Sequence, residues 1–316
     1  MAKEKIKNSI WFVIFDGLKI YFSNIDKFIL YMLFPVFGQI IGLILAFGLT
    51  VGLADKVADK AHSMNSALGI IFLLALPGLL IFMKAFWDYM VAYVALNSMT
   101  EGALTTGHVY DFQSHREVAT RRALKYIGLL LVIGLLSAIG IISSVIILGI
   151  IPSLIIWVFF ILVYQVFTFE DDLSIKECFK KSFYLVKGNW WRTFFLIFIL
   201  WFFSIYIITE GVSVIFDCLH LTDKICSLFD FIGKNLELEY VNKALRYLNK
   251  PEITVNLISK TVFMSLLSTI VIGLSLPIRS ICCTLWYNTL SSIKGNCSEA
   301  KPKKQKRTKK DEVSEE

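Results

Sequence analysis

Residues 126–148 read YIGLLLVIGLLSAIGIISSVIIL, a run that contains no acidic or basic side chain. A helix needs about 20 apolar residues to cross the hydrocarbon core of a bilayer, and this run is long enough. Its apolar residues are continuous, whereas the strands of a membrane barrel alternate apolar and polar residues over about ten positions. Because the bilayer core offers no water to unpaired backbone groups, the run is predicted to be a transmembrane helix.

Five further stretches have the same character. The six predicted spans are 28–53, 68–94, 126–148, 153–169, 194–216 and 257–276. Of the 316 residues, 56% are hydrophobic and 18% are charged, below the roughly 25% of charged residues in soluble domains. Residues 1–27 contain no small-residue cleavage site after a short apolar core, so no removable signal peptide is expected. We predict an all-α polytopic membrane protein whose six transmembrane helices form three pairs.

Basic residues are distributed unevenly among the segments that connect the spans. They are frequent in the N-terminal stretch, after spans two and four, and in the C-terminal tail, whereas the predicted 149–152 turn has none. Cytoplasmic segments of membrane proteins are enriched in Lys and Arg. Both termini are therefore predicted to face the cytoplasm.

The chain repeats a unit that consists of an amphipathic helix, a span, a turn and a second span. The three predicted units cover about residues 8–100, 101–170 and 171–295. In the third unit, Ser174 and Glu177 predict a capping box, in which each side chain satisfies a free amide at the helix start. Ser114 and Glu117 predict a second box in the unit before it. Each amphipathic helix, with one apolar and one polar face, is expected to lie in the membrane interface.

A longer motif surrounds the clearest of these helices. Residues 169–191 read FEDDLSIKECFKKSFYLVKGNWW: acidic residues, a short helix with a Lys-Ser-aromatic group, then Gly-Asn-aromatic. This pattern resembles the membrane domain named for glycerophosphoryl diester phosphodiesterases and the related YciC-like inner-membrane proteins, over about residues 9–294. The resemblance implies a six-span domain in the cytoplasmic membrane of a bacterium or archaeon. The chain departs from the family in its extended 219–256 segment, and it carries no phosphodiesterase domain, so that enzymatic activity is not expected.

Basic residues beside the predicted spans are the candidate contacts for lipid phosphate groups. These candidates are Lys180, Lys181, Lys187, Arg192, Arg121, Arg122 and Arg279. A basic residue near an anionic membrane surface contributes about 1 kcal/mol of attraction. For Arg279, contact with a helix C-terminus is the alternative. The tail 296–316 is expected to be disordered, and its basic part either attracts anionic lipid or is solvated.

Three ionisable residues inside predicted spans form a candidate intramembrane polar site. Lys84 and Asp88 are four residues apart, which puts them on one helix face where they can pair. The pair is either an interfacial ion pair or part of a transport path. Glu210 lies near the outer end of span five without an identifiable partner. No metal-binding, cofactor-binding or catalytic pattern is recognisable, so we expect no cofactor and no enzymatic activity.

Small and aromatic residues predict which helix faces meet protein and which meet lipid. Glycine and alanine pairs four residues apart predict close contacts for spans one and three; the pairs are Gly38–Gly42, Gly48–Gly52 and Gly134–Ala138. Span five, which is rich in Phe and Trp, is predicted to face lipid. The 219–256 segment is predicted to be extracytoplasmic and to contain one or two amphipathic helices. Cys218 and Cys226 pack as small apolar residues or form a disulfide.

Two functional hypotheses follow. The leading one is a non-enzymatic membrane protein that organises lipids, expected to be anionic lipids of the cytoplasmic leaflet, or partner proteins. The alternative is a transporter or lipid-translocating protein with a path between the repeats, whose bends would lie at Pro77, Pro152 and Pro277. A protein partner or a second copy of the chain is left open. Nucleic acid is not expected as a partner, because no folded nucleic-acid-binding module accompanies the basic residues.

Overall fold

The computed structural model describes residues 9–53, 63–107, 112–144, 147–230 and 238–299, together with positions 56, 109 and 234. Within this part of the chain every regular element is a helix. Six helical segments are long and apolar enough to cross a membrane: Ile25–Thr50, Met64–Thr106, Ala123–Ser144, Gly149–Phe169, Trp190–Cys218 and Val255–Lys294. The all-α, six-span prediction is confirmed.

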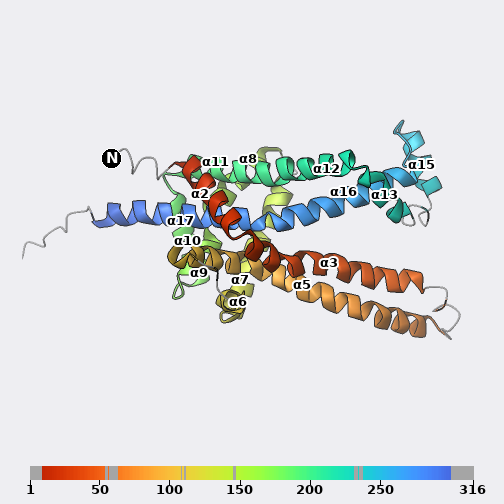
Figure 1. Ribbon diagram of the computed structural model, residues 1–316, viewed down its shortest axis with the longest axis horizontal. Coiled ribbons are helices and arrows are strands. Elements are labelled where there is room, and N and C mark those ends of the chain that lie inside the picture. Colours follow the sequence, from red (N-terminus) through yellow and green to blue (C-terminus); the bar gives the residue numbers. More distant parts are fainter. Residues whose placement is uncertain are drawn as a thin grey trace, which may run out of the picture.

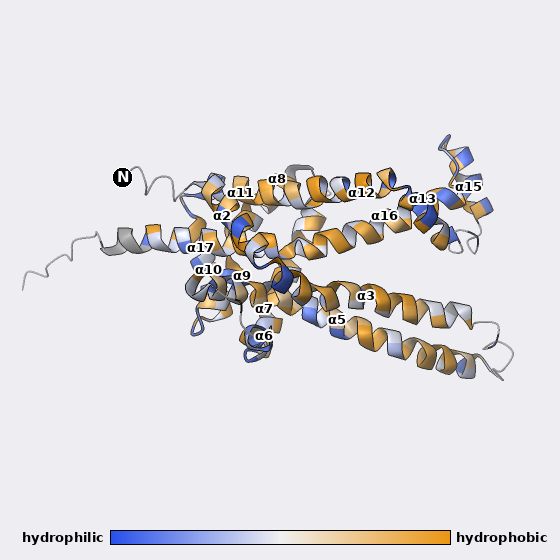
Figure 2. Cartoon of the chain, in the orientation of Figure 1, coloured by the Kyte–Doolittle hydropathy of each residue, from blue (hydrophilic) through white to orange (hydrophobic). Residues whose placement is uncertain are grey.

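Short helices gather at the two ends of the molecule (Figure 1). α2 (Ile10–Ser23), α6 (Phe112–Thr120) and α10 (Ile175–Val186) lie at one end, and we call these three helices the collar. α13 (Leu221–Cys226) and α15 (Leu238–Tyr247) lie at the other end, where the predicted amphipathic helices of the 219–256 segment are found. Figure 2 shows hydrophobic residues along the long helices and hydrophilic residues at α6 and around α13 and α15. This distribution is typical of spans flanked by interfacial segments.

The first pair of spans consists of α3 (Ile25–Gly52) and α5 (Met64–Thr106), which pack closely along their length. A Cβ atom built on Gly42 would lie 2.8 Å from the carbonyl oxygen of Gly78. One built on Gly38 would lie 2.8 Å from the Cβ of Ala85. The absence of side chains therefore lets the two backbones approach, and the predicted contact of Gly38 and Gly42 is confirmed.

The other small-residue contacts were predicted wrongly. A Cβ on Gly48, Gly52 or Gly134 would meet nothing within 4 Å. α7 (Ala123–Ser144), which contains Gly134, buries little of its surface, and its buried residues are Tyr126 and Leu129. The prediction that span three faces protein is therefore wrong, since its exposed apolar side chains suit contact with lipid tails.

The second pair consists of α7 and a span that is broken into two helices. α8 (Ile147–Phe160) and α9 (Val163–Phe169) are separated by Ile161 and Leu162. Pro152 lies inside α8, so the turn predicted at 149–152 is wrong. The proline removes one backbone donor near the helix start, which neighbouring membrane helices can accommodate.

The third pair consists of spans five and six. Span five comprises α11 (Trp190–Phe202), a π-helical turn and α12 (Ile208–Cys218). Four of its aromatic residues are exposed, as predicted: Phe195 49%, Phe198 50%, Trp201 43% and Phe202 45%. Phe194 and Phe203 are partly buried. Span six comprises α16 (Val255–Leu274) and α17 (Leu276–Glu299), and α17 extends beyond the predicted end of the span at residue 276. Residues 300–316 of the predicted tail lie outside the described residues.

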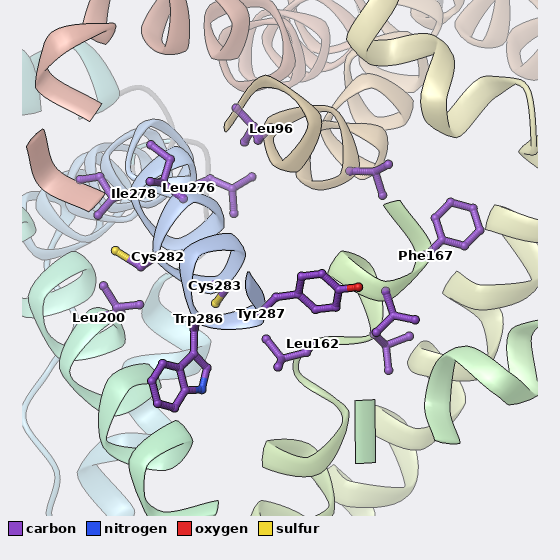
Figure 3. Packing of buried hydrophobic residues seen from close by; sticks show 14 of the residues in the cluster. Leu96, Leu162, Phe167, Leu200, Leu276, Ile278, Cys282, Cys283, Trp286 and Tyr287 are labelled. Carbon is purple, nitrogen blue, oxygen red and sulfur yellow. The ribbon is translucent and has the colours of Figure 1, made fainter. Parts of the chain in front are cut away.

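The main core lies at the collar end and centres on α17. Figure 3 shows Cys282, Cys283, Trp286 and Tyr287 projecting from α17 among residues of other helices, and all four are buried. The indole nitrogen of Trp286 donates a hydrogen bond of 2.9 Å to Thr193 on α11. Buried aromatic side chains contribute most to such cores, and a polar atom on the ring needs a partner there.

The sequence predicted capping boxes at the starts of α10 and α6, and one of the two is present. At α10, the Ser174 hydroxyl accepts from the Glu177 amide at 3.4 Å, and the Glu177 carboxylate accepts from the Ser174 amide at 2.8 Å. This predicted capping box is confirmed. The box predicted at Ser114 and Glu117 is wrong, because α6 already begins at Phe112 and Ser114 lies inside the helix.

The cysteines of the 219–256 region are free thiols. Cys218 is exposed at the end of α12, and Cys226 is buried at the end of α13. The disulfide that the sequence left open is therefore not formed. Cys226 instead packs with Phe263, Leu267 and Val271 of α16, as a small apolar residue would.

Candidate functional site

The three collar helices share one mode of packing. α6 packs on α5, the second span of the first pair, and α10 packs on α9, in the second pair. α2 packs on α17, in the third pair, so the contacts close a ring. At this last contact a Cβ on Gly17 would lie 2.5 Å from the Sγ of Cys282, which explains why α2 carries a glycine there.

An ion pair joins α6 to α5. Lys84 and Asp88, which the spacing placed on one face of α5, lie with Nζ 2.5 Å from Oδ2. Arg116 of α6 adds a second cation, with Nη1 3.7 Å from the other oxygen of Asp88. The Asp88 side chain is 10% exposed and the Lys84 side chain 49% exposed. Asp88 therefore links α5 to α6 through Arg116, which was not among the predicted site residues, while Lys84 pairs with Asp88 within α5.

Glu170 and Asp171 hold α10 and α7 to the end of α9. Glu170 forms an ion pair with Lys181 and accepts a hydrogen bond of 2.6 Å from the Tyr287 hydroxyl. Asp171 lies 2.9 Å from Arg122, whose guanidinium lies over the ring of Phe167. These two acidic residues of the 169–191 motif therefore bind basic residues of the protein itself.

Two further candidates are also engaged internally. Arg121 pairs with Glu117 on α6 at 3.0 Å. Arg279 donates a hydrogen bond of 3.2 Å to the carbonyl oxygen of Ile272, in the last turn of α16. This is the helix C-terminus contact that the sequence offered as the alternative for Arg279, and cations are favourable there.

Besides Arg279, three of the seven basic candidates form no ion pair within the part of the chain that the structure describes. They are Lys180, Lys187 and Arg192, and all three side chains are exposed. Lys176, four residues before Lys180, is exposed in the same way but was not among the candidates. Its spacing from Lys180, which places both on one helix face, is the signal that could have found it.

Lys176 and Lys180 lie at an apolar groove between α7, α8 and α10. The groove has a volume of about 720 Å³. Its lining residues are Val132, Leu136, Phe160, Ile175, Lys176, Phe179, Lys180 and Phe183. The groove therefore combines an apolar wall with two cations, which is the chemistry of an amphiphilic anion such as a phospholipid.

A second hollow follows α10. It has a volume of about 440 Å³ and is lined by the segment from Gly188 to Arg192. Gly188 has a φ of +90°, which ends α10 in a conformation that favours glycine. Trp190 donates a hydrogen bond of 3.3 Å to the carbonyl oxygen of Ile155, while Trp191 is 66% exposed. Tryptophan and arginine side by side are typical of a membrane interface.

A buried polar cluster joins the second spans of the three pairs, and the sequence did not reveal it. The Asn97 carbonyl of α5 accepts hydrogen bonds from Ser280 at 2.7 Å and Thr284 at 3.2 Å, both on α17. It also accepts from Gln165 of α9 at 3.3 Å, and its amide donates to Thr168 at 3.2 Å. All the groups come from apolar stretches in which a single polar residue carries no information about its partners.

Protonation of α10 reflects its cap and its packing. Hydrogen bonds from the Ser174 side chain and backbone lower the pKa of the Glu177 carboxyl, and Lys180 and Lys125 add to the effect. Burial raises the pKa of the Cys178 thiol, which therefore stays protonated at neutral pH. α10 thus carries an ionised Glu177 carboxylate near its start and an unreactive, buried Cys178 thiol.

Glu210, the third residue of the predicted intramembrane polar site, lies apart from Lys84 and Asp88 in the chain. Glu210 is exposed on α12 and forms no ion pair with any residue that the structure describes. Among those residues no group of three or more His, Cys, Asp or Glu side chains could hold a metal ion.

The chain matches no protein-family model, no curated protein and no solved structure.

Proposed function

We propose that this polytopic membrane protein organises anionic lipids of the cytoplasmic leaflet around its collar, without catalysing a reaction. The observation that carries the proposal is the groove beside α10, where Lys176 and Lys180 border an apolar wall. Neither lysine forms an ion pair with a described residue, whereas neighbouring Lys181 is paired with Glu170. Unpaired basic residues at a membrane surface attract anionic lipids.

The packing of the centre supports this proposal over transport. A transport path between the pairs would need space or water where the second spans meet. At that point Asn97, Ser280 and Thr284 are 0% exposed and hydrogen-bond to one another. Their hydrogen-bonding capacity is used within the protein, as expected for a structural contact.

The ion pairs of the collar also support the proposed lipid role. Arg116 and Asp88 join α6 to α5, and Lys181 and Glu170 join α10 to the end of α9. Such contacts hold α6 and α10 in an arrangement that presents the remaining basic residues outward. The proposed lipid role rests on this geometry and does not require the resemblance to the phosphodiesterase-associated membrane domain.

Lipid enrichment around the protein tests the proposal. The protein is extracted from membranes in polymer-bounded discs, and the lipids in the discs are compared with those of the bulk membrane. We expect anionic lipids to be enriched around the wild type. A variant with Lys180→Glu, Lys187→Glu and Arg192→Glu is expected to lose the enrichment, since each basic residue contributes about 1 kcal/mol.

The matched control reverses three exposed lysines at the opposite end of the molecule: Lys224, Lys243 and Lys250. This variant carries the same change in net charge, and it is expected to keep the enrichment of cytoplasmic-leaflet lipids. Equal enrichment in all three proteins, or none in the wild type, would contradict the proposal.

A further inference from the structure

The groove differs from the rest of the basic surface because it has a wall that can hold a hydrocarbon chain. We propose that it is a binding site for one anionic glycerophospholipid, with an acyl chain along the apolar wall and the phosphate between Lys176 and Lys180. This inference deepens the proposed function and rests on it. The inference goes further because it assigns one bound lipid to one site on each chain, whereas the proposed function requires only a general electrostatic attraction.

The size and lining of the groove suit this ligand. Its volume of about 720 Å³ lies within the range of about 300–1,000 Å³ that is usual for small-molecule and cofactor sites. Three helices supply its apolar side chains: Val132 and Leu136 from α7, Phe160 from α8, and Phe179 and Phe183 from α10. A free phosphate ion would leave this wall unused.

Aromatic contacts keep the wall in place. The rings of Phe160 and Phe179 meet edge to face with centroids 5.0 Å apart, and those of Phe159 and Phe183 lie 4.6 Å apart. Aromatic pairs at these separations are attractive. A wall that is already formed loses little conformational freedom when a ligand binds.

The groove is continuous with the lipid-facing surface of α7. Val132 and Leu136 line the groove, while the adjacent residues Leu131 and Leu135 are 69% and 64% exposed. Because α7 is a candidate span, these exposed side chains face lipid tails. An acyl chain can therefore enter the groove sideways from the bilayer.

The two lysines are available because nearby carboxylates are occupied. Lys176 and Lys180 are four residues apart, so they project from the same face of α10. Glu177 lies between them, but its carboxylate accepts hydrogen bonds from the Ser174 amide at 2.8 Å and from the Ser174 hydroxyl at 2.7 Å. Glu170 is paired with Lys181. A phosphate diester fits this pair of cations, and its two remaining oxygens can accept hydrogen bonds from both ammonium groups.

Native mass spectrometry of the detergent-solubilised full chain tests the site. The probes are dioleoyl-phosphatidylglycerol, dioleoyl-phosphatidylcholine and inorganic phosphate. We expect one phosphatidylglycerol to bind more tightly than any further copy, phosphatidylcholine to bind more weakly, and inorganic phosphate not to compete. Lys176→Gln with Lys180→Gln is expected to weaken the first binding step about thirtyfold, since each basic residue contributes about fivefold.

Two further variants separate the groove from general attraction. Leu136→Trp fills the groove without changing the charge and is expected to weaken the first step at least about tenfold, because the acyl chain loses its wall. Lys176→Arg with Lys180→Arg keeps both charges and is expected to retain binding, which shows that changes in α10 are tolerated. Lys187→Gln with Arg192→Gln removes two charges outside the groove and should leave the first step unchanged.

The outcomes distinguish the two proposals. If the Lys187 and Arg192 variant loses phosphatidylglycerol while the groove variants retain it, the site is overturned and the general attraction stands. If inorganic phosphate competes fully, or Leu136→Trp binds as tightly as the wild type, the site is also overturned. If the wild type does not distinguish phosphatidylglycerol from phosphatidylcholine, both the site and the proposed function are wrong.

Discussion

The hydroxyl of Ser182 in α10 donates a hydrogen bond of 2.8 Å to the carbonyl oxygen of Phe159, near the end of α8. The last carbonyls of a helix have no partner within the helix. Ser182 therefore satisfies an acceptor that the break between α8 and α9 would leave unpaired. The serine of the Lys-Ser-aromatic group thus has a structural role at the break in span four.

Removing this hydroxyl is expected to destabilise the protein. Ser182 is 0% exposed, and leaving a buried acceptor without a donor costs about 1–3 kcal/mol. Ser182→Ala should therefore lower the melting temperature in detergent by several degrees. Ser292→Ala is the control, because the Ser292 hydroxyl donates to the Thr289 carbonyl at an exposed position. Equal melting temperatures for the Ser182 variant and the wild type would contradict the assigned role.

Asn97 is expected to be the most sensitive polar residue of the bundle. Its side chain bonds to Ser280, Thr284, Gln165 and Thr168. Asn97→Ala leaves several buried groups unpaired and should destabilise the protein by at least about 2 kcal/mol. Chemical unfolding in detergent measures the loss.

Asn65→Ala provides the control for this experiment. Asn65 lies on the same helix, α5, but is exposed, and exposed substitutions change stability by about 0.5 kcal/mol or less. The two variants should differ clearly. If Asn97→Ala and Asn65→Ala have the same stability, the cluster does not hold the three second spans together.

The cap of α10 is expected to depend on pH. The lowered pKa of Glu177 means that the folded state favours the carboxylate. The resulting stabilisation is present above the unfolded pKa of about 4.3 and disappears as the pH falls through the lower, folded value. Protection of the α10 amides, measured as the exchange rate relative to the intrinsic rate at each pH, should therefore fall in the wild type below about pH 4. Glu177→Gln, which cannot ionise, should show no such fall, and constant protection in the wild type would contradict the prediction.

Cysteine labelling checks the predicted orientation. In a Cys218→Ser, Cys297→Ser background, Lys187→Cys should react with a membrane-impermeant maleimide only after cells are permeabilised. Lys250→Cys, at the opposite end, should react in intact cells. Cys178 is buried and its pKa is raised by burial, so it should stay unlabelled in both samples. Labelling of Lys187→Cys in intact cells would place the collar on the outside and remove the basis of the proposed function.

The sequence predicted the features that depend on local composition. Spans follow from continuous apolar runs, and the start of α10 follows from Ser174 and Glu177, which satisfy each other three residues apart. Ser114 and Glu117 have the same spacing but lie inside α6. The spacing alone does not say where a helix begins when residues before it are also helical.

Features that depend on distant residues could not be predicted. Asn97 and Thr284 are 187 positions apart, and the residues next to each of them do not identify the partner. Gly42 and Gly134 both belong to small-residue pairs, but only Gly42 meets a second glycine, Gly78, on a neighbouring helix. The break at Ile161 and Leu162 contains neither Gly nor Pro, and the hydrogen bond from Ser182 satisfies a carbonyl exposed there.

The packing of α2 on α17 sets a limit on biosynthesis. α2 and α17 are the first and last helices that the structure describes, so the place of α2 on the bundle stays empty until α17 has been inserted. Without α17, the Gly17 face of α2 lacks its partner helix, and the Asn97 carbonyl loses the donors Ser280 and Thr284. Insertion of α17 therefore completes two contacts together, the docking of α2 and the donors of the Asn97 carbonyl.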